Sequence, residues 1–227
     1  MTFQGKRIKI CGLTRREDIA AVNTWKPDYA GFVFAPGKRR ITGSLAGRLR
    51  EMLLPEIPAV GVFVNSPIED IISLAEKKTI DLIQLHGEEG RDYILELKNR
   101  LGPCFPVIKA IRIRSAADIK QAEELPADFL LFDTYTRGLY GGSGKTFDWS
   151  MIPSMGKPWF LAGGLDASNI IEAMKTDAFC LDLSSSVETD GRKDPEKIKE
   201  IIQTVRSGNQ CQKEDLDSTA DNLSPKR

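Results

Sequence analysis

The first strand-like stretch of the chain reads Arg7-Ile8-Lys9-Ile10-Cys11-Gly12-Leu13-Thr14, an extended apolar run that ends in a thiol, a glycine and a hydroxyl. Strand side chains alternate between two faces, so Lys9 and Cys11 share one face, and Ile8 and Ile10 share the other. This pattern is typical of a parallel strand that presents its last residue to an active site. Most isolated strand cysteines are small buried apolar side chains, so the role of Cys11 depends on the rest of the chain.

Short β-rich runs recur along the sequence and alternate with amphipathic helical patterns. The β-rich runs are Ile8–Cys11, Tyr29–Phe34, Ala59–Val64, Asp81–Leu85, Pro106–Ile111, Phe129–Asp133, Trp159–Ala162 and Phe179–Leu183. The helical patterns are Glu17–Trp25, Leu45–Leu54, Ile68–Lys78, Arg91–Asn99, Ala116–Glu124, Ala167–Met174 and Pro195–Val205, with a short helix around Asp148–Ile152. Strict alternation of apolar strands with helices predicts an α/β protein with a parallel sheet, and eight units favour a single (β/α)8 TIM barrel.

The length of 227 residues suits one domain of this fold. We expect the catalytic barrel to span residues 1–207. From Gly208 onward the sequence is polar and loses its apolar periodicity, which predicts a short disordered tail over residues 208–227. Cys211 lies in this tail, and we assign it no role.

The balance of charge narrows the possible partners. Lys plus Arg and Asp plus Glu number 32 each, so the chain has no global charge for nucleic acid or an anionic membrane, and an anionic ligand must be bound locally. No secretory signal or membrane span is evident, which favours the cytoplasm. The four cysteines are scattered without metal-ligand spacing, so we expect reduced thiols, no disulfide and no metal.

In this fold the active site forms at the carboxyl ends of the strands. The residues at the predicted ends are unusually polar: Cys11, Arg39, Arg40, His86, Asp133, Gly163, Gly164, Asp182, Ser184 and Ser185. His86 is the only histidine. A lone histidine is more often structural than catalytic, so we interpret it as a pocket-lining residue.

Cys11 and Asp133 are candidates for base and acid. Asp133 ends the apolar run Phe129–Asp133, and partial burial there would raise its pKa, as a general acid near neutral pH requires. A turn-capping role for Asp133 is the alternative. Cys11 needs the opposite shift, because an ordinary thiol with a pKa of about 8.5 is only slightly ionised at pH 7. We expect Lys9 to increase the thiolate fraction.

Two glycine-containing segments predict ligand contacts. Gly141-Gly142-Ser143-Gly144-Lys145-Thr146 lacks the Walker spacing and is interpreted as a mobile lid over the barrel mouth rather than a nucleotide loop, with a plain flexible turn as the alternative. Gly163-Gly164 and the serines after Asp182 lie where many barrels bind phosphate with backbone NH groups. Tight turns that need small residues are the alternative there.

Over residues 6 to 206 the chain resembles the phosphoribosylanthranilate isomerase family of tryptophan biosynthesis. The motifs that carry the resemblance are Lys9–Thr14, Gly31–Phe34, Gln84–Gly87, Asp133-Thr134, Gly141–Trp149, Ala162–Leu165 and Asp182–Ser185. The resemblance implies a cofactor-free Amadori rearrangement of N-(5-phosphoribosyl)anthranilate to 1-(o-carboxyphenylamino)-1-deoxyribulose 5-phosphate. Cys11 corresponds to the family's general base and Asp133 to its general acid.

The resemblance also implies a small phosphosugar as the binding partner. Its contacts fall on Arg39, His86, Gly142, Gly163, Gly164, Asp182, Ser184 and Ser185. An arginine after the second strand binds the anthranilate carboxylate in the family. An ungapped alignment selects Arg40, whereas the pattern with Ile41 and Thr42 selects Arg39, which we prefer. At Ser186 the family often has glycine, which matters if that position requires a positive φ angle. A homodimer is compatible with the sequence.

Three alternatives stay open at this point. A lyase similar to indoleglycerol-phosphate synthase would need lysine and glutamate at strand ends where this chain lacks them. A non-catalytic barrel that binds a phosphorylated ligand would have no need of both Cys11 and Asp133. A second aminoaldose from histidine biosynthesis is a further possible substrate, although Cys11 replaces the second aspartate expected on the first strand.

Overall fold

The computed structural model describes residues 5–112, 116–133, 149 and 152–221. Within these residues, eight parallel strands close into a barrel in which each strand pairs with the next, and β8 pairs with β1. The strands are β1 (Arg7–Cys11), β2 (Tyr29–Val33), β3 (Ala59–Phe63), β4 (Leu82–Leu85), β5 (Val107–Arg112), β6 (Phe129–Asp133), β7 (Trp159–Ala162) and β8 (Cys180–Leu183). The predicted (β/α)8 barrel is confirmed, and every predicted strand end lies within one residue of the observed end.

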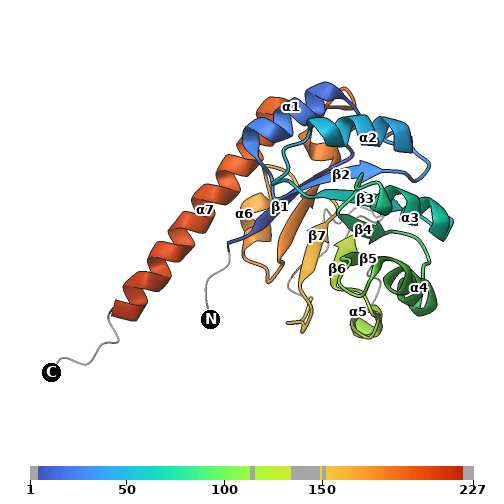
Figure 1. The fold of residues 1–227 in the computed structure, drawn as a ribbon. Helices are drawn as coiled ribbons and strands as arrows, with labels where there is room; N and C mark the ends of the chain where they lie inside the picture. The colour runs from blue at the N-terminus through green and yellow to red at the C-terminus, as the bar shows by residue number, and fades with distance from the viewer. Residues whose placement is uncertain (1–4, 113–115, 134–148, 150–151, 222–227) are drawn as a thin grey trace, which may run out of the picture.

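Helices surround the barrel on its outer face (Figure 1). They are α1 (Arg16–Trp25), α2 (Gly43–Met52), α3 (Ile68–Glu76), α4 (Arg91–Leu101), α5 (Ala116–Glu123), α6 (Ile170–Met174) and α7 (Pro195–Asp221). The outward side chains of β1, Ile8 and Ile10, belong to one buried cluster with Ile19 of α1 and Ile198 of α7. The helices are thus held to the sheet by apolar burial. Most of the short helix predicted around residues 148–152 lies outside the described residues.

Inward side chains of the strands fill the barrel interior in layers, as is usual for this fold. At the amino ends of the strands the interior is aromatic. The ring of Phe160 lies 5.6 Å from Tyr29 and 5.7 Å from Phe129, measured between centroids. The next layer towards the carboxyl ends contains Lys9 and Asp182, which are register partners on β1 and β8. On β6 and β8, apolar side chains thus line the interior at the amino end, and Asp133 and Asp182 lie nearer the carboxyl end.

The chain after β8 differs from the sequence prediction in two respects. A 3-10 turn, η2 (Ser185–Val187), leads into a small antiparallel hairpin of β9 (Glu188–Thr189) and β10 (Arg192–Lys193). Its turn contains Asp190 and Gly191 at positive φ angles. The sequence analysis did not predict this hairpin, since two-residue strands have too few positions to produce a recognisable period.

The second difference concerns the polar segment that we predicted to be a disordered tail from residue 208. In the structure α7 continues as helix to Asp221 and projects beyond the barrel (Figure 1). Loss of apolar periodicity removes the signal for packing, but residues 209–221 contain no proline or glycine that would end a helix. The contacts of the barrel also extend past residue 207. Asn209 exchanges two hydrogen bonds with the backbone of Lys6, at 2.8 and 3.0 Å.

Candidate active site

The predicted acid and base residues lie at the carboxyl ends of their strands and face the barrel interior. On β1, Lys9 and Cys11 face the barrel interior while Ile8 and Ile10 pack outward, as the alternation predicted. On β6, Phe129 and Leu131 pack in the interior cluster, and Asp133 is the next residue on the same face of the strand. The structure thus brings the candidate residues of β1, β4, β6 and β8 to one mouth of the barrel.

Cys11 is buried at the end of β1, beside Gly31 of β2. A Cβ at position 31 would lie 2.7 Å from the Cys11 sulfur and 2.9 Å from its Cα, so the glycine leaves the space that the thiol occupies. Burial raises the pKa of Cys11 above its ordinary value, and Lys9 offsets only part of that rise. Lys9 therefore lowers the pKa of Cys11, as expected, but burial outweighs this effect and the net shift is upward.

The charge of Lys9 is itself paired inside the barrel. Its ammonium lies 2.7 Å from Asp182 Oδ2 and 2.8 Å from Gln84 Oε1, and the side chain is fully buried. Burial opposes the charge of Lys9, but Asp182 together with Cys11 raises its pKa above the ordinary value. Among the described residues, the second carboxylate oxygen of Asp182, Oδ1, is buried and has no hydrogen-bond partner. It is positioned to accept a hydrogen bond from a ligand.

A second line of contacts leads from Gln84 to Asp133. Gln84 Nε2 lies 3.0 Å from His86 Nδ1, and His86 Nε2 lies 3.3 Å from Asp133 Oδ2. The side chains of His86 and Asp133 are 23% and 24% exposed, so both can reach a ligand in the mouth. Sequence reasoning missed Gln84, although its place two residues before His86 puts it on the same face of the strand.

Arg39 lies across the end of β1. Its Nε and Nη2 donate to the two carboxylate oxygens of Glu188 at 2.6 and 2.8 Å, in the bidentate geometry that arginine favours. The side chain passes over Gly12, where a Cβ would lie 2.4 Å from Arg39 Cδ and where φ is +85°. Glycine at position 12 therefore serves both the backbone turn and the path of the arginine.

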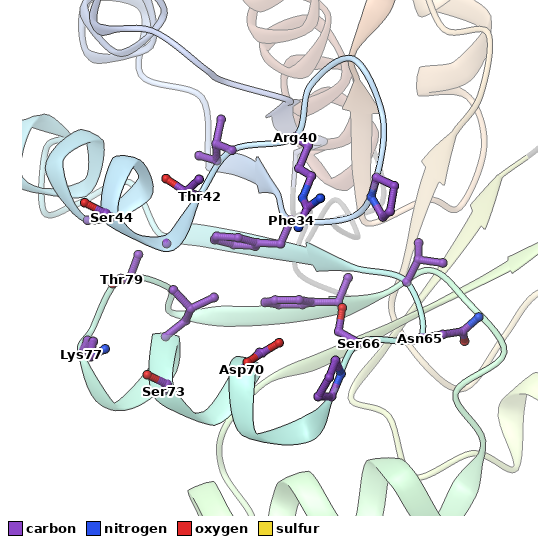
Figure 2. Close-up of a pocket in the computed structure, with 18 of the residues that line it drawn as sticks. Phe34, Arg40, Thr42, Ser44, Asn65, Ser66, Asp70, Ser73, Lys77 and Thr79 are labelled. Carbon is purple, nitrogen blue, oxygen red and sulfur yellow. The ribbon is translucent and has the colours of Figure 1, made fainter.

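Arg40, the other predicted carboxylate ligand, takes a different direction. It lines a groove of about 890 Å³ on the outside of the barrel between α2 and α3 (Figure 2). The stacked rings of Phe34 and Phe63, 5.0 Å apart, also line this groove. The geometry thus separates the two arginines and favours Arg39 for a ligand in the barrel mouth.

Glu188 also accepts a hydrogen bond from Lys193 Nζ at 2.7 Å, and the same ammonium donates to the carbonyl of Ser184 at 2.8 Å. Burial opposes ionisation of Glu188, but the hydrogen bonds from Arg39 and Lys193 hold its pKa at about 2. Through Glu188 and Lys193, the hairpin β9–β10 therefore links Arg39 by hydrogen bonds to Ser184, the first residue after β8. Neither Glu188 nor Lys193 was predicted from the sequence, since both follow the last strand in a segment without periodicity.

The predicted phosphate site lies at the ends of β7 and β8. Gly163 and Gly164 have φ angles of 88° and 69°, so both adopt the conformation that favours glycine. Ser184 Oγ donates to the Cys11 carbonyl at 3.1 Å. Ser185 starts the turn η2, which also contains Ser186. Ser186 is not at a positive φ angle, so a serine is compatible with this backbone.

Some sequence predictions lie outside the described residues. Gly142 and the predicted lid over residues 141–146 belong to this group. Within the described part of the chain, no group of three or more His, Cys, Asp or Glu side chains could hold a metal ion. The same part contains no helix that is long and apolar enough to cross a lipid bilayer.

Comparisons with known proteins show the family of the chain. Residues 8–204 match the family described as N-(5'phosphoribosyl)anthranilate (PRA) isomerase. The N-(5'-phosphoribosyl)anthranilate isomerase of Endomicrobium trichonymphae is 52% identical over 202 residues, which cover 88% of this chain and 98% of that protein.

Two solved structures have the same fold over most of their length. Phosphoribosyl anthranilate isomerase from Thermotoga maritima is 37% identical with a TM-score of 0.76, and the match covers 89% of this chain and 99% of that one. A phosphoribosyl anthranilate isomerase in complex with reduced 1-(o-carboxyphenylamino)-1-deoxyribulose 5-phosphate is 33% identical with a TM-score of 0.74, at 89% and 99% coverage. The chain therefore belongs to the phosphoribosylanthranilate isomerase family, whose members are isomerases of tryptophan biosynthesis.

Proposed function

We propose that this protein converts N-(5-phosphoribosyl)anthranilate into 1-(o-carboxyphenylamino)-1-deoxyribulose 5-phosphate, with Cys11 as general base and Asp133 as general acid. The observation that carries the proposal is that a thiol and a carboxyl group occupy the last inward positions of β1 and β6, at one barrel mouth. Family membership and a related enzyme solved with the reduced product support the same reaction.

The reaction starts at Asp133. Its carboxyl group gives a proton to the furanose ring oxygen, the bond from that oxygen to C1′ breaks, and the anthranilate nitrogen supplies the electron pair that forms a Schiff base. Cys11 as thiolate then removes the C2′ proton. The C–H electron pair forms the C1′–C2′ double bond, and the nitrogen regains its pair in the resulting enolamine. Tautomerisation of the enolamine to the ketone completes the rearrangement.

The substrate has two anionic ends, and each has candidate ligands. Arg39 binds the anthranilate carboxylate. Among the described residues its hydrogen bonds use Nε and Nη2 for Glu188, so Nη1 serves the ligand. Backbone NH groups near Gly164 and Ser185 bind the phosphate, which suits a chain with no net charge. Asp182 Oδ1 accepts a hydrogen bond from a substrate hydroxyl, since that buried oxygen otherwise has no partner within the described structure.

The test is a turnover assay with purified protein and N-(5-phosphoribosyl)anthranilate, followed by the loss of substrate fluorescence. Cys11→Ala and Asp133→Asn should each lower kcat by at least about 10²-fold, since general acid or base catalysis contributes about 10²–10⁴-fold. Cys180→Ala is the matched control, because Cys180 is also a buried interior cysteine but lies at the other end of the barrel. It should keep its turnover.

Two results would contradict the proposal. Folded wild-type protein without turnover of this substrate would exclude the reaction. Turnover that survives both active-site substitutions, in variants that keep their circular dichroism spectrum, would exclude the assigned roles.

A further inference from the structure

One chain of hydrogen bonds joins the base side of the barrel mouth to the acid side. It runs from the Lys9 ammonium to Gln84 Oε1, from Gln84 Nε2 to His86 Nδ1, and from His86 Nε2 to Asp133 Oδ2. We propose that Gln84 is a positioning residue that holds His86 as the neutral tautomer with its proton on Nε2. The Nε2–H group then donates a hydrogen bond to Asp133. The functional consequence rests on the proposed role of Asp133 as general acid.

The orientation of the Gln84 amide follows from Lys9. An ammonium has three donors and no acceptor, so the Gln84 atom 2.8 Å from it must be the oxygen. Lys9 stays protonated because the salt bridge to Asp182, at 2.7 Å, raises the pKa of Lys9 against the effect of burial. Gln84 is 2% exposed, so its amide has little access to water as an alternative hydrogen-bond partner. The amide nitrogen must then face His86.

The tautomer of His86 follows from Gln84. The amide Nε2 is a donor only, so His86 Nδ1 at 3.0 Å must accept and cannot carry a proton. In a neutral imidazole the one proton is then on Nε2, which lies 3.3 Å from Asp133 Oδ2. A second proton on Nδ1 would set two N–H groups against each other. Gln84 therefore selects both the tautomer and the neutral state.

This arrangement suits an acid at Asp133. An N–H directed at Oδ2 stabilises the carboxylate of Asp133 after its proton has left. An imidazolium in the same place would form an ion pair with Asp133 and favour the carboxylate before reaction. A neutral histidine thus stabilises the product of proton transfer without removing the proton beforehand.

Two buried ion pairs lie near His86, one inside the barrel and one at the neighbouring loop. Inside the barrel, Asp182 is bound to Lys9. On the strand and loop beside His86, Lys109 of β5 is 3.0 Å from Glu89, and its Nζ also donates to the carbonyl of Gly87. Arg112 is the register partner of Asp133 at the exposed end of β5. Among the described residues, Gln84 is the hydrogen-bond partner of Nδ1, and by this proposal it decides whether Nδ1 carries a proton.

Nuclear magnetic resonance can read this tautomer directly, because the chain contains one histidine. Long-range ¹H–¹⁵N spectra of the ¹⁵N-labelled full-length protein at pH 7, without substrate, should show Nε2 protonated and Nδ1 unprotonated. In Gln84→Glu the new carboxylate accepts from Nδ1, so both ring nitrogens should be protonated and kcat should fall by about 10²-fold. In Gln84→Met the single tautomer should be replaced by a mixture. The exposed substitution Gln203→Glu is the matched control and should leave the spectrum unchanged.

A wild-type spectrum with the proton on Nδ1, or with protons on both nitrogens, would overturn the proposal. So would an unchanged tautomer in both Gln84 variants, and Gln84→Met keeps this test valid if Gln84→Glu does not fold. The spectra do not depend on turnover. A fixed Nε2–H tautomer together with an active Asp133→Asn variant would contradict the acid role of Asp133 and leave the tautomer of His86 standing.

Discussion

The two ends of the barrel interior are built from the same strands but from opposite kinds of side chain. At the amino ends, Tyr29, Phe129, Phe160 and Phe179 pack ring against ring. Nearer the carboxyl ends, Lys9 and Asp182 form a buried ion pair. They follow Arg7 and Cys180 by two positions on β1 and β8. The aromatic end can be optimised for packing alone, whereas the polar end needs every charge paired. Stability and chemistry are therefore separated along strands such as β6 and β8, as the fold allows.

The largest expected effect comes from breaking the polar end. Lys9→Met should lower the free energy of unfolding by about 3–5 kcal/mol, because Asp182 would be left as a buried carboxylate without its partner. Chemical denaturation of the purified variant measures this loss, and turnover should fall as well. The pair Lys26–Glu56 is the matched control, since its side chains are 56% and 52% exposed at 3.2 Å.

Lys26→Met should cost no more than about 1 kcal/mol, the usual limit for a surface pair. The double substitution Lys9→Met with Asp182→Leu should regain much of the lost stability without regaining turnover, since it removes both buried charges. Equal destabilisation by Lys9→Met and Lys26→Met would show that the buried pair has no special cost.

The aromatic end should respond in stability but not in chemistry. Phe160→Ala removes a fully buried ring and should lower the free energy of unfolding by about 3–5 kcal/mol through lost burial and a cavity. The kcat of the molecules that remain folded should match that of the wild type. Thermal unfolding and an assay well below the midpoint measure the two quantities. A kcat loss as large as that of Cys11→Ala would mean that the two ends are coupled.

A smaller effect concerns acid stability at the polar end. The pKa of Glu188 is held at about 2, below its usual value of 4.5. Because the folded-state pKa is the lower one, the ionised group stabilises the fold above about pH 4.5, and this stabilisation is lost as the pH falls towards about 2. Glu188→Gln should remove most of this pH dependence, which at 1.36 kcal/mol per pKa unit is at most about 3 kcal/mol and is reduced by solvent screening. Urea denaturation from pH 5 to pH 2 compares the variant with the wild type.

The control for Glu188→Gln is Glu56→Gln, which removes an exposed carboxylate from a surface pair. Its unfolding curves should follow those of the wild type over the same pH range. Parallel curves for Glu188→Gln and the wild type would mean that Arg39 and Lys193 do not stabilise the Glu188 carboxylate.

The fold was predictable because it depends on local periods. Alternating positions such as Ile8, Lys9 and Cys11 show which side chains face the interior, and the spacing of helical patterns gives the barrel. Hydrogen-bond partners far apart in the sequence were not predictable in this way. Lys9 and Asp182 are separated by 173 positions, and no local pattern indicates that the charge of Lys9 is already paired.

The same limit applies to the rest of the site. Cys11 and Asp133 could be named as candidates because each ends an apolar strand, whereas Glu188 and Lys193 lie on two-residue strands that leave no pattern. Arg39 and Arg40 are adjacent, and only the backbone path after β2 separates them. The sequence therefore predicts the candidates at the strand ends, whereas contacts between distant segments determine which side chains meet and how their charges are paired.

The smallest expected effect is a difference in reactivity between two cysteines. Burial raises the pKa of Cys11, and Lys9 offsets this only in part. Since the thiolate is the reactive species, iodoacetamide at pH 7.5 should modify Cys11 at least about 10-fold more slowly than the exposed Cys104. Mass spectrometry of peptides from a time course measures the two rates. In protein unfolded by urea the two rates should become similar.

The result bears on when the base is formed. If Cys11 is a thiol in the free protein, it must lose its proton during the catalytic cycle, and kcat/KM should rise with pH as the thiolate fraction increases. A Cys11 that reacts faster than Cys104 at pH 7.5 would instead mean that a thiolate exists before substrate binds. In that case the ammonium of Lys9 would have to stabilise Cys11 more strongly than its salt bridge to Asp182 allows.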